Sequence, residues 1–293
     1  MKASFVIVNY NRKEEILLTI SKTKKTIEET PGTFELIVVD NASTDGSATA
    51  IKEQFPDVIL IENPVNTGAP AWNVGFEKAK GQYFIILDDD SHIESGLEGA
   101  LNYLDNNSNV GVLALNITGG AYQTVYWKDL EEKDGFIGCG AIVRKELYDK
   151  IGGYADWIFL YTNEWDYGIR AMEAGYKVIY YQNCHVTHRA SVINRTSKRL
   201  IVFSVRNEMA IVYKYFSKSS RDKYVTRVFI NNLKGIRKYG LTSISWYMEA
   251  LKEFKALKKT LPHTPVRPEI QNAYQRRFWS TRFPLRGLFD KTK

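Results

Sequence analysis

The chain has 293 residues, of which 44% are hydrophobic and 25% charged, a balance that allows a sizeable core and excludes a disordered protein. The charge is uneven: residues 195–293 hold 23 Lys and Arg against 6 Asp and Glu, while residues 1–194 have a net charge of −10. No window approaches the ~20 apolar residues of a membrane span and no signal peptide is recognisable, so we expect a cytoplasmic protein without a structural disulfide.

Apolar, strand-like segments alternate with helix-like segments through the first half of the chain. The predicted strands are residues 4–8, 34–40, 57–62, 82–87 and 110–115. A helix is predicted after each of the first four strands. The first helix runs from about residue 13 to 29, and the next three end at about residues 55, 80 and 106. Strands separated by helices of 10–15 residues favour βαβ units, so the sequence predicts an α/β fold with a mostly parallel central sheet flanked by helices.

The pattern is less regular beyond residue 116. "FIGCGAIV" (136–143) and "YKVIYY" (176–181) are typical of strands, and "TNEWDYGIRAMEAG" (162–175) of a helix that ends at a glycine. From about residue 195 the chain is helix-like, basic and aromatic. We therefore predict an α/β domain at residues 1–215 and a helical, basic C-terminal extension at 216–293.

Polar clusters follow three of the predicted strands: "NYN" (9–11), "DNAS" (40–43) and "DDD" (88–90). In parallel sheets, ligands bind beyond the carboxyl ends of the strands. The three clusters are therefore expected to converge on one site.

The aspartate triplet needs a stabilising partner because adjacent carboxylates repel one another. Asp88 and Asp90 are two residues apart and point to the same side of an extended backbone, which suits a hard divalent ion such as Mg²⁺ or Mn²⁺. The alternative is an acidic N-terminal cap for the next helix, with Asp90 or Ser91 as the capping residue.

Two carboxylates, Glu164 and Asp166, lie at the start of the helix predicted over 162–175. Acidic side chains there stabilise the helix dipole, which would be a purely structural role. A general base is the other interpretation, and it requires a pKa near neutrality and access to a substrate hydroxyl. The spacing favours the structural role.

Other candidate ligands are His185 and His188, whose imidazoles could complete a metal site, and Gly68, which precedes a helix start that could bind an anion. Each is also compatible with an ordinary surface or loop position. No G-x-G-x-x-G follows the first strand and no Walker-type Gly-Lys-Ser/Thr occurs, which argues against dehydrogenases and P-loop NTPases.

Taken together, the segments resemble a family 2 glycosyltransferase of the GT-A fold, most closely its rhamnosyltransferase-like branch. The resemblance covers about residues 3–215. It rests on "VIVNYNR", "IVVDNASTDGS", "ENPVNTGAPAWNVGF", "FIILDDDS", "GFIGCGAIVRKELYDKIGGY", "FLYTNEWDYGIRAMEAGYKV" and "VTHRAS" in this order.

The resemblance implies an inverting transfer of a sugar from a nucleotide sugar to an acceptor hydroxyl. It implies that Asp40 contacts the base, that Asp88 lies against the ribose or donor sugar, and that Asp90 binds Mn²⁺ or Mg²⁺, with His188 as a second metal or diphosphate contact. Asp89 is expected to point to the opposite side, into the sheet or a neighbouring turn. The implied nucleotide-sugar-binding set is Asn9, Asn11, Asp40, Asn41, Gly68, Asn73, Asp88 and Asp89.

The family's base position falls on Glu164. The usual pattern is Glu-Asp-x-Asp followed by Leu-x-x-Arg, whereas this chain has Asn163-Glu164-Trp165-Asp166 and then Tyr167 and Arg170. Glu164 keeps a carboxylate, one methylene longer. By this resemblance we expect Glu164 to be the general base, with Asp166 as the alternative.

Two other classes stay open: a sugar nucleotidyltransferase, which would release pyrophosphate, and a non-catalytic sugar- or membrane-binding relative. UDP- and dTDP-linked donors are both compatible, and the acceptor would be a carbohydrate or lipid-linked glycan in polysaccharide assembly. The basic C-terminus either contacts an anionic membrane surface peripherally or packs on the core. No nucleic-acid-binding motif is recognisable, so nucleic acid is not expected as a partner.

Overall fold

The computed structural model describes residues 1–119, 123–191 and 196–279. These residues form two compact units. The first comprises Met1–Asp156 and residues 163–191, and the second comprises Trp157–Thr162 and the described residues from 196 onward. The division lies just after residue 191, whereas the sequence predicted a first domain through residue 215.

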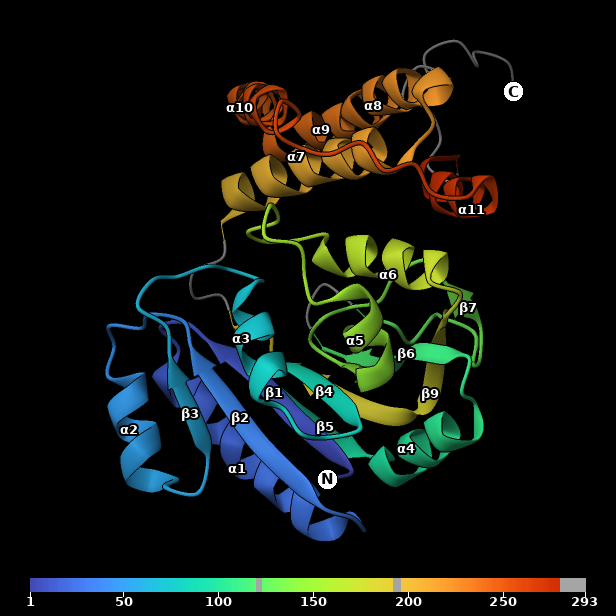
Figure 1. The fold of residues 1–293 in the computed structure, drawn as a ribbon. Helices are drawn as coiled ribbons and strands as arrows, with labels where there is room; N and C mark the ends of the chain where they lie inside the picture. Colours follow the sequence, from blue (N-terminus) through green and yellow to red (C-terminus); the bar gives the residue numbers. More distant parts are fainter. Residues whose placement is uncertain (120–122, 192–195, 280–293) are drawn as a thin grey trace, which may run out of the picture. The chain divides into compact units, whose positions relative to one another are not determined.

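A nine-stranded sheet forms the centre of the first unit (Figure 1). Its strands are β1 (Ala3–Asn9), β2 (Phe34–Asp40), β3 (Ile59–Glu62), β4 (Tyr83–Asp88), β5 (Ser91–Ser95), β6 (Val110–Thr118), β7 (Glu132–Lys133), β8 (Ala141–Arg144) and β9 (Lys177–His188). They follow the order β3-β2-β1-β4-β8-β6-β9-β5, and β7 pairs with β9. The strands from β3 to β4 are parallel, while β8 pairs antiparallel with both β4 and β6.

Helices cover both faces of this sheet. The helices of the unit are α1 (Lys13–Glu29), α2 (Ser47–Gln54), α3 (Ala71–Lys78), α4 (Leu97–Asn106), α5 (Lys145–Ile151) and α6 (Asn163–Glu173). Phe5 and Ile7 of β1 join a core with α1, α2 and α4, whereas the alternate residues Val6 and Val8 join a second core with α3, α5 and α6. β1, β4, β6 and β8 consist mostly of buried apolar residues because both faces of the sheet are covered.

The parallel register brings the polar strand ends to one level. Asn9 at the end of β1 pairs with Asp40 at the end of β2, and Val8 pairs with Asp88 at the end of β4. The predicted convergence of these three strand ends is thereby confirmed.

Three local predictions were incomplete. A helix was expected directly after the aspartates, but "SHIES" (91–95) forms β5, because β9 offers it an antiparallel partner. The strand expected at 136–143 begins only at Ala141, since only residues from there pair with β4 and β6. The last strand is longer than predicted and continues to His188.

The second unit is helical and contains the one-turn helices η1 (Leu233–Gly235) and η2 (Leu241–Ser243). Its α-helices are α7 (Ser197–Tyr215), α8 (Lys218–Asn232), α9 (Ile236–Tyr239), α10 (Ile244–Leu257) and α11 (Pro268–Trp279). Among all described helices, none combines the length and apolarity needed to cross a bilayer. The predicted helical character of the C-terminal part is confirmed.

Candidate active site

The three aspartates after β4 have different surroundings. Asp89 is buried: its Oδ1 accepts a bond from the Arg12 guanidinium at 2.7 Å, and its Oδ2 accepts from the Tyr10 backbone N–H at 3.3 Å. Asp88 is only half-buried. The middle carboxylate therefore points into the fold and helps to fix the loop after β1, as expected for the opposite side of the backbone.

Asp90 is fully buried and lies within a network of donors. Its Oδ2 is 3.2 Å from Arg12 Nη1 and accepts a bond from the Ser191 backbone N–H at 2.9 Å, while its Oδ1 is 3.2 Å from Nε2 of His188. Pairing of Ser91 with His188 across β5 and β9 places this imidazole beside the triplet. The structure therefore brings the two predicted metal ligands, Asp90 and His188, together.

Arg12 offsets the repulsion within the triplet. Burial lowers the pKa of this guanidinium, but the charges of Asp89, Asp90 and Asp88 outweigh that effect and raise it. Burial raises the pKa of Asp89 to about 7 against the opposing charge of Arg12, and the neighbouring carboxylates add to the rise. A buried arginine thus does part of what the sequence interpretation assigned to a divalent ion.

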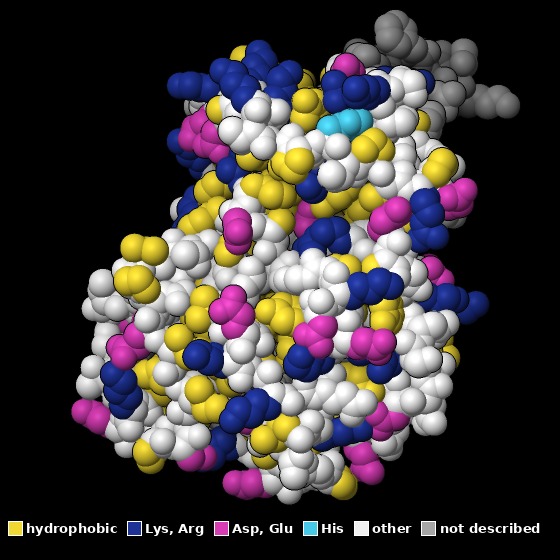
Figure 2. Space-filling view, viewed as in Figure 1, with side chains coloured by type: hydrophobic (Ala, Val, Ile, Leu, Met, Phe, Trp, Pro, Cys, Tyr) yellow, Lys and Arg dark blue, Asp and Glu magenta, His cyan; other side chains and the backbone are white. Residues whose placement is uncertain are grey.

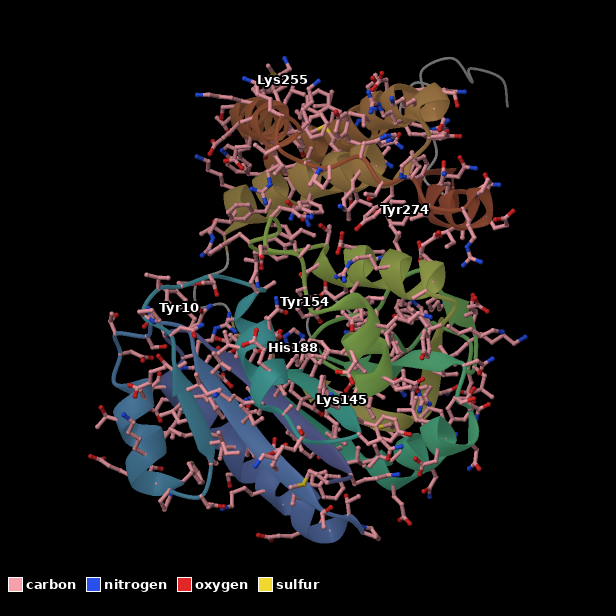
Figure 3. The ribbon with its side chains drawn as sticks, in the orientation of Figure 1. Tyr10, Lys145, Tyr154, His188, Lys255 and Tyr274 are labelled. Atoms are coloured by element: carbon pink, nitrogen blue, oxygen red, sulfur yellow. The ribbon has the colours of Figure 1, made fainter. Side chains whose placement is uncertain are left out.

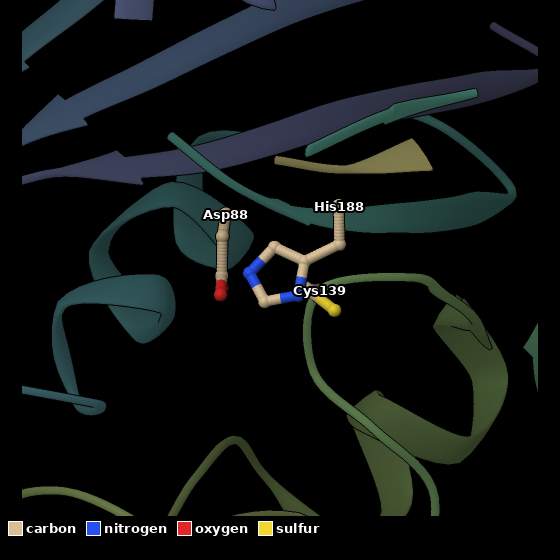
Figure 4. Close-up of side chains that lie close together, drawn as sticks. All are labelled: Asp88, Cys139 and His188. Atoms are coloured by element: carbon tan, nitrogen blue, oxygen red, sulfur yellow. The ribbon is translucent and has the colours of Figure 1, made fainter. Parts of the chain in front are cut away.

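Asp88 belongs to a separate group of side chains whose atoms could bind a metal ion. One ligand atom each of Asp88, Cys139 and His188 lie within 4.8 Å of one another (Figure 4). In that view the imidazole lies between the carboxylate and the thiol. Imidazole nitrogen, carboxylate oxygen and thiolate sulfur together form a donor set that suits a borderline divalent ion such as Zn²⁺ more closely than Mg²⁺. Among these described residues, the structure thus supplies a metal-compatible cluster.

The ends of β1 and β2 are joined by buried polar contacts. Asn9 donates from Nδ2 to Asp40 Oδ2 at 3.0 Å and to Ser43 Oγ at 3.1 Å, and the Ser43 backbone N–H donates to Asp40 Oδ1. Asn11 has a left-handed φ of 52° and accepts a bond from the Thr44 N–H at 2.6 Å. These hydrogen bonds join the loops after β1 and β2 into one surface, which is called the ledge from here on.

Asn41 connects this ledge to the loop before α3. Its Nδ2 donates to Asn66 Oδ1 at 2.9 Å and to the Gly68 carbonyl at 3.4 Å, and its Oδ1 accepts from the Thr67 N–H at 3.1 Å. Gly68 has a φ of 69°, which glycine adopts without strain. The two predicted binding residues Asn41 and Gly68 thus lie together.

Asn73 makes a reciprocal pair with the backbone of Tyr154. Its Nδ2 donates to the Tyr154 carbonyl at 2.8 Å, and its Oδ1 accepts from the Tyr154 N–H at 2.7 Å. Through these bonds α3 holds the segment after α5, so the direct partner of Asn73 is the backbone of this segment.

Glu164 is half-buried in the first turn of α6. Burial raises its pKa to about 7, and the charge of Asp88 adds to the rise. Its Oε1 accepts a bond from the Gly138 N–H at 3.1 Å, and a Cβ at Gly138 would lie 2.6 Å from this oxygen, so glycine leaves the space that the carboxylate occupies. The predicted base candidate therefore has a near-neutral pKa beside Asp88.

Tyr154 belongs to the same neighbourhood. It is buried, and its pKa is raised well above the ordinary value by burial and then by the charges of Glu164 and other groups including Asp88. Figure 3 labels this tyrosine, from the segment after α5, and His188, from the end of β9. Glu164, Asp88 and Tyr154 therefore share one electrostatic environment.

The other candidate base, Asp166, has a different environment. It is fully buried and accepts a bond at 2.8 Å from Nε of Arg170, which also donates to the carbonyls of Ile151 and Gly153. This arrangement ties α6 to the end of α5. His185 is exposed on β9, where its Nδ1 lies 3.2 Å from Asn116 Nδ2.

The sequence matches the model of glycosyl transferase family 2 over residues 4–170, more than half of the chain. The chain belongs to this family. The match includes the strand ends, the aspartate triplet and the two carboxylates in the first turn of α6, Glu164 and Asp166.

Among curated relatives, this glycosyltransferase is 30% identical over 112 residues to an uncharacterized glycosyltransferase of Haemophilus influenzae, covering 38% of this chain and 37% of the relative. It is 35% identical over 101 residues to a poly(ribitol-phosphate) beta-glucosyltransferase of Bacillus spizizenii, and this match covers 32% of this chain and 16% of that relative. The match thus spans well under half the length of either relative.

The solved structure of a mannosyltransferase, PcManGT from Pyrobaculum calidifontis, in complex with GDP-Man and Mn²⁺, is similar to this glycosyltransferase with a TM-score of 0.60. The alignment covers 99% of this chain and 88% of that one at 17% identity. This likeness shows the fold, which is the predicted GT-A fold; the rhamnosyltransferase branch has no such support.

Two residues of the candidate site were not identified from the sequence. Arg12 could have been found from topology, because a cation three residues after the end of β1 lies next to the acidic end of β4 once the two strands pair. Cys139 gave only a weak signal in the sequence, a cysteine between two glycines. Its position beside Asp88 and His188 depends on the fold of the segment before β8.

Proposed function

We propose that the chain transfers a sugar, with inversion, from a nucleotide-diphosphate sugar to an acceptor hydroxyl, and that Glu164 is the general base. The observation that supports this most directly is the position of Glu164, half-buried with a pKa of about 7 beside Asp88. A carboxylate with a near-neutral pKa can accept a proton at physiological pH, and such a base contributes ~10²–10⁴-fold to the rate.

The proposed reaction is a single displacement. The acceptor oxygen forms a bond to the anomeric carbon of the donor sugar while the bond from that carbon to the diphosphate oxygen breaks. The acceptor proton passes to the Glu164 carboxylate, and the nucleoside diphosphate leaves with the bonding electron pair. The Gly138 N–H, which bonds one oxygen of Glu164, orients the other for the acceptor.

The ledge at the ends of β1 and β2 is the proposed nucleotide site. Asn9 is fully buried, and within the described structure its Oδ1 has no hydrogen-bond partner although Nδ2 has two. A buried acceptor without a partner is costly, and a donor group of a bound base would satisfy it. Asp40, Asn11 and Asn41 shape the rest of this surface, and Asp88 faces the sugar.

A divalent ion fits the cluster of Asp88, Cys139 and His188 by its donor set. When bound, such an ion stabilises the negative charge of the departing diphosphate. Asp90 would then orient His188 from behind, since its Oδ1 is 3.2 Å from the imidazole Nε2. We propose Mn²⁺ before Mg²⁺ because nitrogen and sulfur donors favour the softer ion.

The acceptor is proposed to be a carbohydrate or a lipid-linked glycan of a cell-surface polysaccharide. One relative is named for transfer to a ribitol phosphate polymer, an anionic acceptor. The basic second unit would attract such an acceptor or an anionic membrane surface, because opposite charges steer association. By this proposal the enzyme acts peripherally at the inner face of the membrane.

The test is a donor panel with purified protein. UDP-, dTDP- and GDP-sugars are incubated with Mn²⁺ or Mg²⁺, and release of nucleoside diphosphate is measured with and without candidate acceptors. The expected result is release of a nucleoside diphosphate from one donor class, abolished in Asp88→Ala. Release of pyrophosphate from a nucleoside triphosphate and a sugar phosphate would instead identify a nucleotidyltransferase. Absence of any turnover, with donor binding intact, would favour a non-catalytic relative.

A further inference from the structure

A cavity of about 440 Å³ lies within the helical second unit, between α7, the end of α8 and the segment from η1 to α10. A water molecule accounts for about 30 Å³ of liquid, and ligand sites commonly measure about 300–1,000 Å³. The cavity therefore has the size of a small-ligand site. The Lys and Arg side chains that gather over this unit are visible in Figure 2.

Asn231, at the end of α8, lines this cavity with an unsatisfied side chain. The residue is 6% exposed, and neither its Nδ2 nor its Oδ1 has a hydrogen-bond partner in the described structure. Buried amides almost always have partners, and leaving both atoms without one destabilises the fold. A ligand that offers both an acceptor and a donor would satisfy this amide.

The polar part of the lining is cationic. Lys234 and Lys238 are the charged residues of the described lining, which contains no carboxylate. Ser204 and Tyr247 add hydroxyl groups. Gly235 leaves room for the Tyr247 hydroxyl, because a Cβ at position 235 would lie 2.1 Å from its oxygen. The polar groups thus suit an anion with several acceptor oxygens.

The remaining lining is aliphatic, formed by Leu200, Ile201 and Val205 of α7. We propose that the cavity binds a phosphate monoester carried on an apolar stem, with the phosphate at Asn231, Lys234 and Lys238 and the stem along α7. Two ammonium groups match the charge of about −1.5 to −2 on a phosphate monoester at pH 7, and lysine binds phosphate as a point charge. This site is separate from the residues proposed for sugar transfer.

The test measures binding to the full chain by isothermal titration calorimetry, without a nucleotide sugar. Geranyl phosphate is the probe with an apolar stem, glucose 1-phosphate the probe with a polar stem, and geraniol the probe without phosphate. We expect geranyl phosphate to bind at least about tenfold more tightly than either of the others. Equal or tighter binding of glucose 1-phosphate would overturn the apolar-stem assignment, and failure of geranyl phosphate to bind would overturn the site.

The decisive variant is Asn231→Leu, because it separates a binding role from a structural one. Replacing an unsatisfied buried amide by an apolar group of similar size leaves stability unchanged or raises it. We therefore expect the thermal midpoint without ligand to stay level or rise while geranyl phosphate binds about tenfold more weakly. A lower midpoint with unchanged affinity would mean that the amide is structural, which contradicts the proposal.

A matched charge control comes from the same unit. Lys238→Gln is expected to weaken geranyl phosphate binding about tenfold, whereas Lys255→Gln, on α10 and outside the lining (Figure 3), is expected to change it by less than twofold. Equal losses in the two variants would mean that the overall positive charge attracts the probe, and would overturn the assignment to this cavity.

Discussion

The end of β4 and the start of α6 each present a cluster of carboxylates, and an arginine divides both clusters in the same way. Arg12 pairs with Asp89 and Asp90, and Arg170 pairs with Asp166. The paired carboxylates are buried to 5% exposure or less.

Asp88 and Glu164 are the half-buried members of the two clusters, and the charge of Asp88 raises the pKa of Glu164. Arginine thus separates carboxylates that stabilise the fold from those that face the proposed reaction. The same division helps to explain how repelling charges are tolerated at one sheet edge, since the Arg12 guanidinium offsets part of the charge of the triplet before any ligand binds.

The largest expected effect is on catalysis at Glu164. Glu164→Gln should lower kcat by ~10²–10⁴-fold with donor binding retained, because the amide cannot accept the acceptor proton. Steady-state kinetics measure kcat, and titration with the donor measures donor binding. Asp166→Asn is the matched control, and it should lower the thermal midpoint while the folded protein keeps most of its kcat. A loss of kcat in Asp166→Asn as large as in Glu164→Gln, at unchanged stability, would break the comparison.

The next largest effect is on stability at Arg12. Arg12→Met leaves Asp89 and Asp90 buried without their guanidinium, and removing one partner of a buried ion pair typically costs about 3–5 kcal/mol of unfolding free energy. Urea unfolding at pH 7.5 measures this loss of unfolding free energy. Lys13→Met changes the adjacent residue, which makes no ion pair with these carboxylates in the described structure, and it should change stability by less than about 1 kcal/mol. Equal effects of the two variants would show that Arg12 does not neutralise the triplet.

A smaller effect is expected on metal binding. If Cys139 is a ligand together with Asp88 and His188, the Co²⁺-loaded protein should show a thiolate-to-cobalt charge-transfer band. Cys139→Ser should lose this band and bind Co²⁺ at least about tenfold more weakly. Cys184 is also buried but does not belong to this cluster, and burial raises its pKa to about 12, so Cys184→Ser should leave the band intact. A band that survives in Cys139→Ser would exclude the thiolate.

The smallest effect concerns pH. Folding raises the pKa of Glu164 from its ordinary value near 4.5 to about 7, so between these values the folded state binds a proton that the unfolded state has lost. Unfolding free energy should therefore fall as pH rises through this window. Thermal midpoints from pH 4.5 to 8 should decline less steeply in Glu164→Gln than in the natural protein. Part of the decline should persist, because Asp89 also has a raised pKa of about 7.

Local patterns were sufficient for much of the fold. α1 and β2 have the predicted bounds, because an amphipathic helix and a mostly apolar strand are encoded in their own residues. β5 could not be predicted in this way, since "SHIES" is mostly polar and is extended only because β9 pairs with it. The same is true of the second half of β9, which contains His185 and His188.

The sequence by itself determined the α/β class, the family, and the placement of Asn9, Asp40 and Asp88 at one sheet edge, because parallel strands of similar length end together. Only the tertiary structure decided which carboxylates are neutralised and which remain near the site. For the triplet and for Glu164, that choice depends on Arg12 and Gly138, which are distant in sequence from the carboxylates they contact, whereas Arg170 lies four residues after Asp166 on the same helix. Charge pairing and desolvation act through space, so they depend on which atoms the fold brings together.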